Sequence, residues 1–326
     1  MPTGLPGTRT RPPAVAGAFY PRDPNRLRSQ VLGLLGEATV SPNVVPKALI
    51  APHAGYVYSG RVAASAFATL RDRAASITRV VLIGPAHYVH IQGIAAPTVD
   101  AFLTPVGCVP VDVEGLSAID DLQFVVRTDA PHAPEHSLEV ELPFLQTMPT
   151  SFEVVPLVVG DTRPQGVALV LRRLWEGMET LIVVSSDLSH YHSYESARRL
   201  DLATAAAIEQ GNWASLGPDQ ACGCLAVANR TPWLKGPTSR IMQFRRHGRL
   251  ARPGCRIRNV VVRSDGGVSP SLQTGRPSKR PFQALSGHAQ SAYCPDLAKR
   301  LRIDPKRTFV GFHLRTSAGL SCTLRP

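Results

Sequence analysis

Short apolar runs alternate with segments of helical apolar spacing through the first 230 residues of the chain. Four runs have the length and composition of buried strands, at 48–50, 80–83, 153–160 and 180–184. Helical spacing of apolar residues predicts helices at 25–36, 61–70, 165–175 and 196–210. Residues 91–111 read as short strands and turns. This alternation predicts an α/β fold in which helices cover both faces of a central sheet.

Polar side chains with ligand chemistry follow three of the four runs. His53 comes after the first run, His87 after the second, and Asp187 and His190 after the fourth. In open α/β sheets, ligands bind in the crevice outside the carboxyl ends of the strands. We therefore expect these side chains to meet at one rim of the sheet.

Two further segments add candidates to that rim. Residues 129–145 carry His136 and Glu139, which lie three positions apart and could share a helical face toward the site. Ser137 is expected to cap the following helix, with Glu139 or Glu141 near its positive end. Cys222 lies between a polar turn and an apolar run.

The pattern leaves three interpretations of the rim open. Imidazole with carboxylate or thiolate suits iron(II), copper or zinc rather than calcium or magnesium, and two histidines plus one anionic ligand leave open positions. A histidine that is not a ligand, His190 or His136, could then transfer protons. Alternatively, Cys222 could be a nucleophile with a histidine and Asp187, or the histidines could only hold loops together.

Composition and charge narrow the function classes. The net charge of +12 divides unevenly, because residues 1–230 carry net −4 and residues 231–326 carry net +16. The basic residues do not interleave with aromatics, so nucleic-acid binding has little support. The sequence contains no run of about eighteen apolar residues, the pattern that would predict a membrane-spanning helix. No secretory signal is visible either. The six cysteines lack metal-finger spacing, and a cytoplasmic setting is the default expectation.

Several segments of the chain resemble the Memo family, whose bacterial members are often labelled AmmeMemoRadiSam system protein B. The resemblance runs in the family's order through about two-thirds of the chain. The matching segments are VAGAFYP (15–21), APHAGYVYSG (51–60), GPAH (84–87), EHSLEVELPFL (135–145), VVSSDLSH (183–190) and the Cys-Gly of ACGC (221–224).

The resemblance implies a fold, a metal site and a set of partners. It implies a mixed sheet like that of class III extradiol dioxygenases, with a mononuclear non-haem metal crevice. By this resemblance the metal ligands are His53, His87 and Cys222, the metal is iron(II) or copper, and the chemistry is redox. Asp187, His190 and His136 would act in catalysis near the metal. A radical SAM protein and a companion domain would be partners, and the substrate would be a small molecule or a peptide.

The carboxyl-terminal part departs from the family pattern. We expect a flexible arm over 1–10, a Memo-like domain over 11–230, and a basic, Pro/Ser/Arg-rich segment over 231–326 that is disordered or frameshifted. Back-translation of residues 243–249, shifted by one base, can encode Asn-Ser-Gly-Asp-Thr, a stretch that the family has after the Cys-Gly. A frameshift between about 228 and 242 would explain the change in charge; a lineage-specific basic tail is the alternative.

Two functions therefore remain open. One is a metal-dependent, dioxygenase-like redox enzyme in which Asp187 and His190 support the ligands. The other is a non-catalytic scaffold or metal-handling protein that uses the same crevice to bind a peptide or a partner.

Overall fold

The computed structural model describes residues 7–40, 46–212, 215–227, 241–242 and 260–263. The chain divides into two units, Met1–Ser271 and Leu272–Pro326. All the described residues lie in the first unit, so most of the segment 231–326 lies outside the description that follows. The predicted arm is described only from residue 7, and its end, Thr10, begins the first strand.

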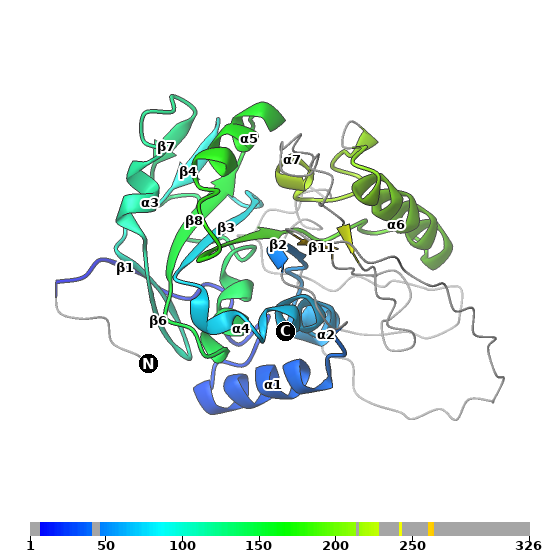
Figure 1. The fold of residues 1–326 in the computed structure, drawn as a ribbon, viewed down its shortest axis with the longest axis horizontal. Helices are drawn as coiled ribbons and strands as arrows, with labels where there is room; N and C mark the ends of the chain where they lie inside the picture. The colour runs from blue at the N-terminus through cyan, green and yellow to red at the C-terminus, as the bar shows by residue number, and fades with distance from the viewer. Residues whose placement is uncertain (1–6, 41–45, 213–214, 228–240, 243–259, 264–326) are drawn as a thin grey trace, which may run out of the picture. The chain divides into compact units, whose positions relative to one another are not determined.

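A mixed sheet forms the centre of the described part of the chain (Figure 1). Its middle strands β2, β9, β3 and β8 run parallel to one another, whereas β4 and β11 pair antiparallel to β8 and β2. The strands in spatial order are β10 (Ile241–Met242), β11 (Val260–Arg263), β2 (Pro46–Ala51), β9 (Thr180–Ser185), β3 (Arg79–Pro85), β8 (Glu153–Val159), β4 (Ile94–Ala96) and β7 (Val125–Arg127). The four predicted strands are thus confirmed as neighbours in one sheet.

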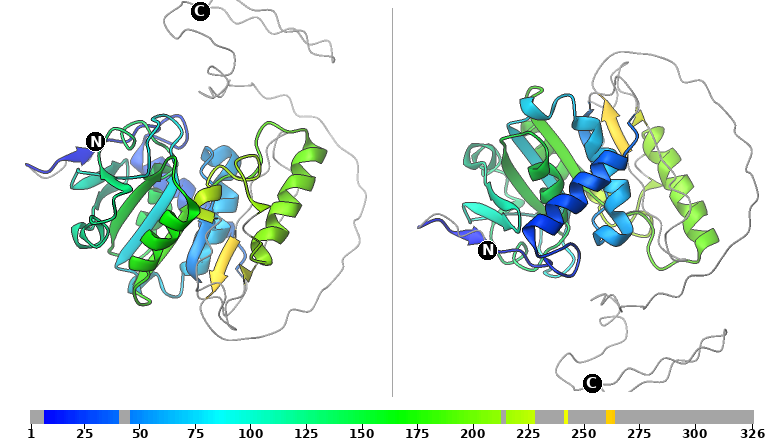
Figure 2. Two further views of the ribbon diagram at one scale, coloured as in Figure 1. Left: turned by 90° about the horizontal axis from the view of Figure 1, so that it is seen from above. Right: turned by 90° about the horizontal axis from the view of Figure 1, so that it is seen from below.

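Helices flank both faces of this sheet, as predicted. α1, α2 and α4 contact one another below the strands in Figure 1, and α5 and α7 contact each other above them. Figure 2 shows α1 lying across α2. The helices described are α1 (Pro24–Glu37), α2 (Tyr56–Phe67), α3 (Val113–Ser117), α4 (Leu142–Thr147), α5 (Pro164–Arg173), α6 (Tyr194–Glu209) and α7 (Cys224–Val227), with 3-10 segments at η1 (Ala68–Leu70), η2 (Ala74–Ser76) and η3 (Glu139–Glu141).

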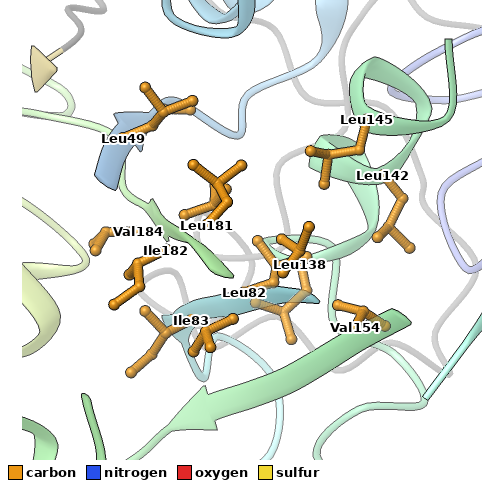
Figure 3. Close-up of a cluster of buried hydrophobic side chains, with 14 of the residues drawn as sticks. Leu49, Leu82, Ile83, Leu138, Leu142, Leu145, Val154, Leu181, Ile182 and Val184 are labelled. Atoms are coloured by element: carbon orange, nitrogen blue, oxygen red, sulfur yellow. The ribbon is translucent and has the colours of Figure 1, made fainter. Parts of the chain in front are cut away.

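Successive side chains along the parallel strands point alternately to the two faces of the sheet, and both faces are packed with apolar residues. Leu49 and Leu82 lie on the face covered by Leu142 of α4, while Ile83 and Ile182 point to the opposite face (Figure 3). All five side chains are almost fully buried. Strands that are covered on both faces consist of continuous runs of apolar residues. The sequence pattern alone therefore predicted these strands.

A smaller sheet joins the amino-terminal segment to the main body. It consists of β1 (Thr10–Arg11), β5 (Ala101–Thr104) and β6 (Gly107–Pro110). β1 pairs parallel to β5, and β5 pairs antiparallel to β6. The chain then turns into α1, whose amino end is capped by Asp23 accepting from the backbone N–H of Arg26 at 2.8 Å.

Two strands occur in the segment for which the sequence predicted no regular structure. Val260–Arg263 pairs antiparallel to β2, and Ile241–Met242 pairs with it in turn (Figure 2). The apolar triplet Val260, Val261 and Val262 suits an outer strand beside the buried β2. The frameshift hypothesis concerns residues outside those described and stays a prediction.

The parallel order β2-β9-β3-β8 places four carboxyl ends at one edge of the sheet. His53 follows β2, Asp187 follows β9 and His87 follows β3. Because β9 lies between β2 and β3, the segment that carries Asp187 leaves the sheet between the segments that carry the two histidines. None of the described helices is both long and apolar enough to cross a membrane.

Candidate metal centre

His53 is buried at the centre of the rim, and its ring is held from both sides. Nδ1 lies 2.7 Å from the hydroxyl of Ser185, and Nε2 lies 3.2 Å from Sγ of Cys222. Its backbone N–H donates to Oδ1 of Asp187 at 2.9 Å. Burial lowers the pKa of His53 to about 3, so the ring is neutral at physiological pH and has a lone pair for a metal.

His87 is oriented by a carboxylate that the sequence analysis did not single out. Glu135 accepts from the Nδ1 of His87 at 2.8 Å and from its backbone N–H at 2.7 Å. Burial opposes ionisation of Glu135, but hydrogen bonds and charge from His87 lower its pKa to about 2. Since Nδ1 is engaged, a metal at this ring would be bound by Nε2.

His136 completes a cluster of three imidazoles. Its ring stacks on His87 at a centroid distance of 4.7 Å and meets His53 edge-on at 5.5 Å. Phe19, from the amino-terminal segment, covers it at 4.8 Å. Burial, with a smaller effect of His87, lowers the pKa of His136 to about 4. Nδ1 of His136 is buried and lies 3.3 Å from Oε1 of Glu135, outside hydrogen-bond geometry.

Asp187 and His190 lie beside the cluster. Nε2 of His190 is 3.5 Å from Oδ2 of Asp187, and its side chain is about one-third exposed. Burial opposes ionisation of Asp187, but the neighbouring His53 and His190 outweigh it and lower the pKa of the carboxyl. The loop between them is tethered by Ser189, whose hydroxyl donates to the buried Asp201 of α6 at 2.8 Å.

Cys222 reaches the cluster because the residue after it is glycine. The N–H of Gly223 donates to the hydroxyl of Ser186 at 3.0 Å, and a Cβ at this position would meet Ser186 Cβ at 2.7 Å. This close approach sets Sγ of Cys222 beside His53, where it accepts from the N–H of Asp187 at 3.2 Å. Burial and the charge of Asp187 raise the pKa of the thiol.

The donor set fits a metal that binds imidazole and thiolate. One ligand atom from each of His53, His87 and His136 lies within 4.8 Å of the others. The 3.2 Å between His53 Nε2 and Cys222 Sγ is close to the roughly 3.5 Å that separates nitrogen and sulfur ligands on one tetrahedral ion. The structure groups the predicted ligands His53 and His87 with His136, whereas the predicted ligand Cys222 contacts His53 and is not a member of that three-histidine group.

Glu139, predicted to share a face with His136 toward the site, is directed to the amino-terminal segment instead. It is fully buried, forms an ion pair with Arg11 and accepts from the hydroxyl of Tyr20. It also accepts from the backbone N–H groups of Ala14 and Val15 at 2.7 and 3.1 Å. The prediction fails because 136–141 is an irregular turn and 3-10 segment, in which the i, i+3 rule of a helix does not hold.

Ser137 does not cap the helix as expected. α4 begins only at Leu142 and has no side-chain cap, and the hydroxyl of Ser137 donates to the carbonyl of Pro85 at 3.0 Å. Gly84 permits this approach, since a Cβ there would lie 2.9 Å from Ser137 Oγ. Glu141 directly precedes α4, near its positive end as expected, and is fully buried under Ser185.

A cavity of about 350 Å³ has Cys222 in its lining, but none of the three clustered histidines. Its walls are mainly apolar, from Pro85, Ile91, Val159 and Leu225. Asp161, another lining residue, accepts from Gln92 at 3.2 Å. The cavity is large enough for a small organic molecule.

The arrangement does not favour a nucleophilic cysteine. A reactive thiol needs a lowered pKa or a competent base beside it. Here the pKa of the Cys222 thiol is raised, and that of the adjacent His53 is lowered. Both shifts keep the sulfur protonated unless a cation displaces the proton.

Comparison with known proteins agrees with the site. A sequence model of the family described as Memo-like protein matches residues 11–217, a span that contains all the site residues except Cys222, just beyond its end. A MEMO1 family protein of Aquifex aeolicus is 38% identical over 208 residues, covering 63% of this chain and 76% of that protein. One of Archaeoglobus fulgidus is 34% identical over 257 residues, covering 74% and 94%. The chain belongs to the Memo family.

Proposed function

We propose that this protein is a metal-dependent redox enzyme, dioxygenase-like in its chemistry, that holds a single iron(II) or copper ion at the sheet rim. The observation that carries the proposal is the convergence of three imidazoles, two of which follow strand ends and one of which lies in the loop before η3, with the thiol of Cys222 beside His53. His53, His87 and Cys222 are the proposed ligands. His136 is either a fourth ligand or a proton-transfer group.

The choice of metal follows from the donors. Imidazole suits iron, copper and zinc, and thiolate favours soft or borderline ions, whereas no carboxylate belongs to the three-histidine group. A bound iron or copper ion would supply one-electron redox chemistry that the side chains lack. The thiolate would change the metal's electronics relative to a carboxylate ligand, so cleavage of catechols is not part of the proposal.

The residues that contact the proposed ligands have different roles. Glu135 orients His87 and keeps its Nδ1 protonated. Asp187 holds the backbone of His53 and faces His190, whose partly exposed ring can exchange protons with solvent. Phe19 shields His136 from water.

The substrate would bind in the cavity that Cys222 helps to line. Its apolar walls suit a small organic molecule or one side chain of a peptide. A radical SAM protein and a companion domain are proposed partners, and the cytoplasm the proposed location.

A scaffold or metal-handling role is the second candidate, favoured by exposed aromatic side chains close in sequence to the site. Tyr58 follows His53, and Tyr191 follows His190; they are 41% and 58% exposed. Tyr191 adopts a left-handed backbone conformation, φ 59°, which is unusual for a residue other than glycine. Residues of this kind suit contact with a peptide or protein.

Metal content of anaerobically purified protein tests the first proposal. We expect about one iron or copper ion per chain by mass spectrometry, and its loss in His53→Ala and Cys222→Ala. The matched controls are His90→Ala and Cys108→Ala, which alter exposed residues outside the ligand set.

Oxygen uptake then separates the two functions. Consumption of oxygen with a small organic or peptide substrate supports the enzyme. Stoichiometric metal with no turnover supports the scaffold or metal-handling role. Absence of any metal from the wild-type protein contradicts both the redox enzyme and the metal-handling role.

A further inference from the structure

A second cavity, which we call the amino-end cavity, lies at the opposite end of the parallel strands from the metal centre. Its volume is about 880 Å³, and its lining includes the first residue of three neighbouring strands: Arg79 of β3, Glu153 of β8 and Thr180 of β9. The candidate ligands follow the carboxyl ends of the strands, so the length of β3, roughly 20 Å, separates the two places. A cavity of this size can hold a small organic molecule.

The hydroxyl of Thr180 is buried at this cavity without a partner. Thr180 has no exposed surface, and its Oγ1 makes no hydrogen bond to any described residue. In the register of the sheet, Arg79 lies opposite both Thr180 and Glu153, so the three side chains project from the same face. Since all three line the cavity, the hydroxyl is directed into it. A buried hydroxyl without a hydrogen bond is unfavourable, and a valine would fill the same space without that cost.

Carboxylates outnumber cations around the amino-end cavity. Its lining holds five acidic side chains and one basic side chain, that of Arg79. Arg79 already faces three of the acids, because it forms ion pairs with Asp112 and Glu176 and lies 3.6 Å from Glu114. Two carboxylates therefore line the cavity without a counter-charge in it.

These two acids are Glu153 and Glu179, which are exposed and form no ion pair with any described residue. Glu179 belongs to the loop before β9, and the buried Lys47 and Arg73 hold this loop through its backbone carbonyl oxygens. Even with these two cations counted, the acids exceed the cations by five to three. The field at the cavity thus favours a positively charged ligand.

The geometry favours an organic cation over a metal ion. Within the described part of the chain, only the three clustered histidines bring their ligand atoms close enough together for a metal. Glu153 lies opposite Arg79 on one side, and Glu179 directly precedes the residue opposite Arg79 on the other side. At about 4.8 Å between neighbouring strands, the backbones of the two acids lie roughly 10 Å apart. A ligand with two separated charges could reach both acids, and the valine side chains in the lining suit methylene groups.

We propose that the amino-end cavity binds a linear organic polycation of the polyamine class, with Glu153 and Glu179 as charge partners and Oγ1 of Thr180 accepting from an ammonium N–H. Binding would supply the hydrogen bond that the hydroxyl lacks and the counter-charges that the two carboxylates lack. The inference does not rest on the proposed function, because it requires neither a metal nor a reaction.

Calorimetric titration of the full chain with spermidine tests the charge partners, at about 150 mM salt so that long-range attraction is screened. We expect one spermidine to bind per chain, and no binding of octane-1,8-diol, which has the same chain length and no charge. Glu153→Gln and Glu179→Gln should each weaken binding by about fivefold or more. The matched control is Glu195→Gln, which removes an exposed acid of α6 and should leave the affinity unchanged.

Variants of Thr180 test the hydrogen bond separately from the charge. Thr180→Val keeps the shape of the side chain and removes the hydroxyl, so spermidine should bind about tenfold more weakly. Urea unfolding should show that the free variant is at least as stable as the wild type, because an unsatisfied polar group is gone. Thr180→Ser keeps the hydroxyl and should keep the affinity.

The outcomes that would overturn the proposal are distinct from a failure of the metal site. Spermidine that does not bind, or that binds Glu153→Gln, Glu179→Gln and Thr180→Val as tightly as the wild type, refutes the site, and water would then be the partner of the hydroxyl. Equal binding of the diol refutes the assignment of a cation. Each result can be obtained with metal-free protein.

Discussion

Sγ of Cys222 lies 3.2 Å from Nε2 of His53, although 169 positions separate the two residues in the chain. His53 is delivered by the end of β2, and Cys222 by the turn before α7, which returns across the end of β9. The contact requires the close approach of Gly223 to Ser186. Four predictions follow from this and the neighbouring contacts.

Removing the charge of Glu135 should weaken the metal site without unfolding the protein. In Glu135→Gln the acceptor for His87 Nδ1–H becomes a neutral amide oxygen, so the ring is held less firmly and is a weaker ligand. Changes of this kind cost roughly 10- to 100-fold in metal affinity. Competition with a chelator measures the effect. Equal affinity of Glu135→Gln and wild type would show that the carboxylate does not support a ligand.

Gly223→Ala should displace Cys222. The added Cβ would lie 2.7 Å from Ser186 Cβ and 2.9 Å from the backbone oxygen of Ser185, so the turn must move. We expect loss of metal binding with a moderate loss of stability. The control is Gly33→Ala in the middle of α1, where a Cβ meets nothing within 4 Å. That change should raise the free energy of unfolding by about 0.5–1 kcal/mol and leave metal content unchanged.

Metal affinity should rise with pH because the pKa of the Cys222 thiol is raised. The thiol is protonated through pH 6–8, and binding as a thiolate releases one proton, so affinity should increase about tenfold per pH unit. His53 is already neutral in this range and adds no dependence, since its pKa is lowered to about 3. Chelator competition at several pH values should show this slope in the wild type. An affinity that does not change between pH 6 and 8 would exclude thiolate ligation.

His132 should make the fold sensitive to acid, independently of the metal. It is buried, Nε2 lies 3.2 Å from the carbonyl oxygen of Ala95, and burial lowers its pKa to about 4. A lowered histidine pKa means that the unfolded chain binds the proton first. Stability is therefore unaffected above pH 6.5 and falls as pH drops from 6.5 to 4, by at most about 3 kcal/mol from this residue.

Urea unfolding of the metal-free protein at several pH values tests this prediction. The variant His132→Gln keeps a hydrogen-bond donor for Ala95 but cannot titrate. Its free energy of unfolding should decline less between pH 6.5 and 4 than that of the wild type. Parallel declines in the two proteins would rule out His132 as a source of the acid sensitivity.

Local sequence patterns were enough to predict the four parallel strands, the main helices and the edge of the sheet at which the candidate site lies. Strands buried on both faces appear as apolar runs, and helices as spaced apolar positions, because both patterns depend on nearby residues. Histidines that directly follow parallel strands must meet at one edge, so His53 and His87 could be expected there. Cys222 was a candidate for the same rim from its place in the sequence, and the family resemblance singled it out as a ligand.

The groups around those ligands could be identified only from the three-dimensional packing. Glu135, Ser185 and Glu141 are placed by contacts across 44 to 132 positions in the chain, and no local pattern records such contacts. Glu139 was assigned to the wrong side because its direction depends on the amino-terminal segment that packs over it. Likewise Val260–Arg263 becomes a strand because β2 offers it an unpaired edge. Periodicity reports the local conformation of the chain, whereas the partners of a buried polar group depend on how distant segments pack.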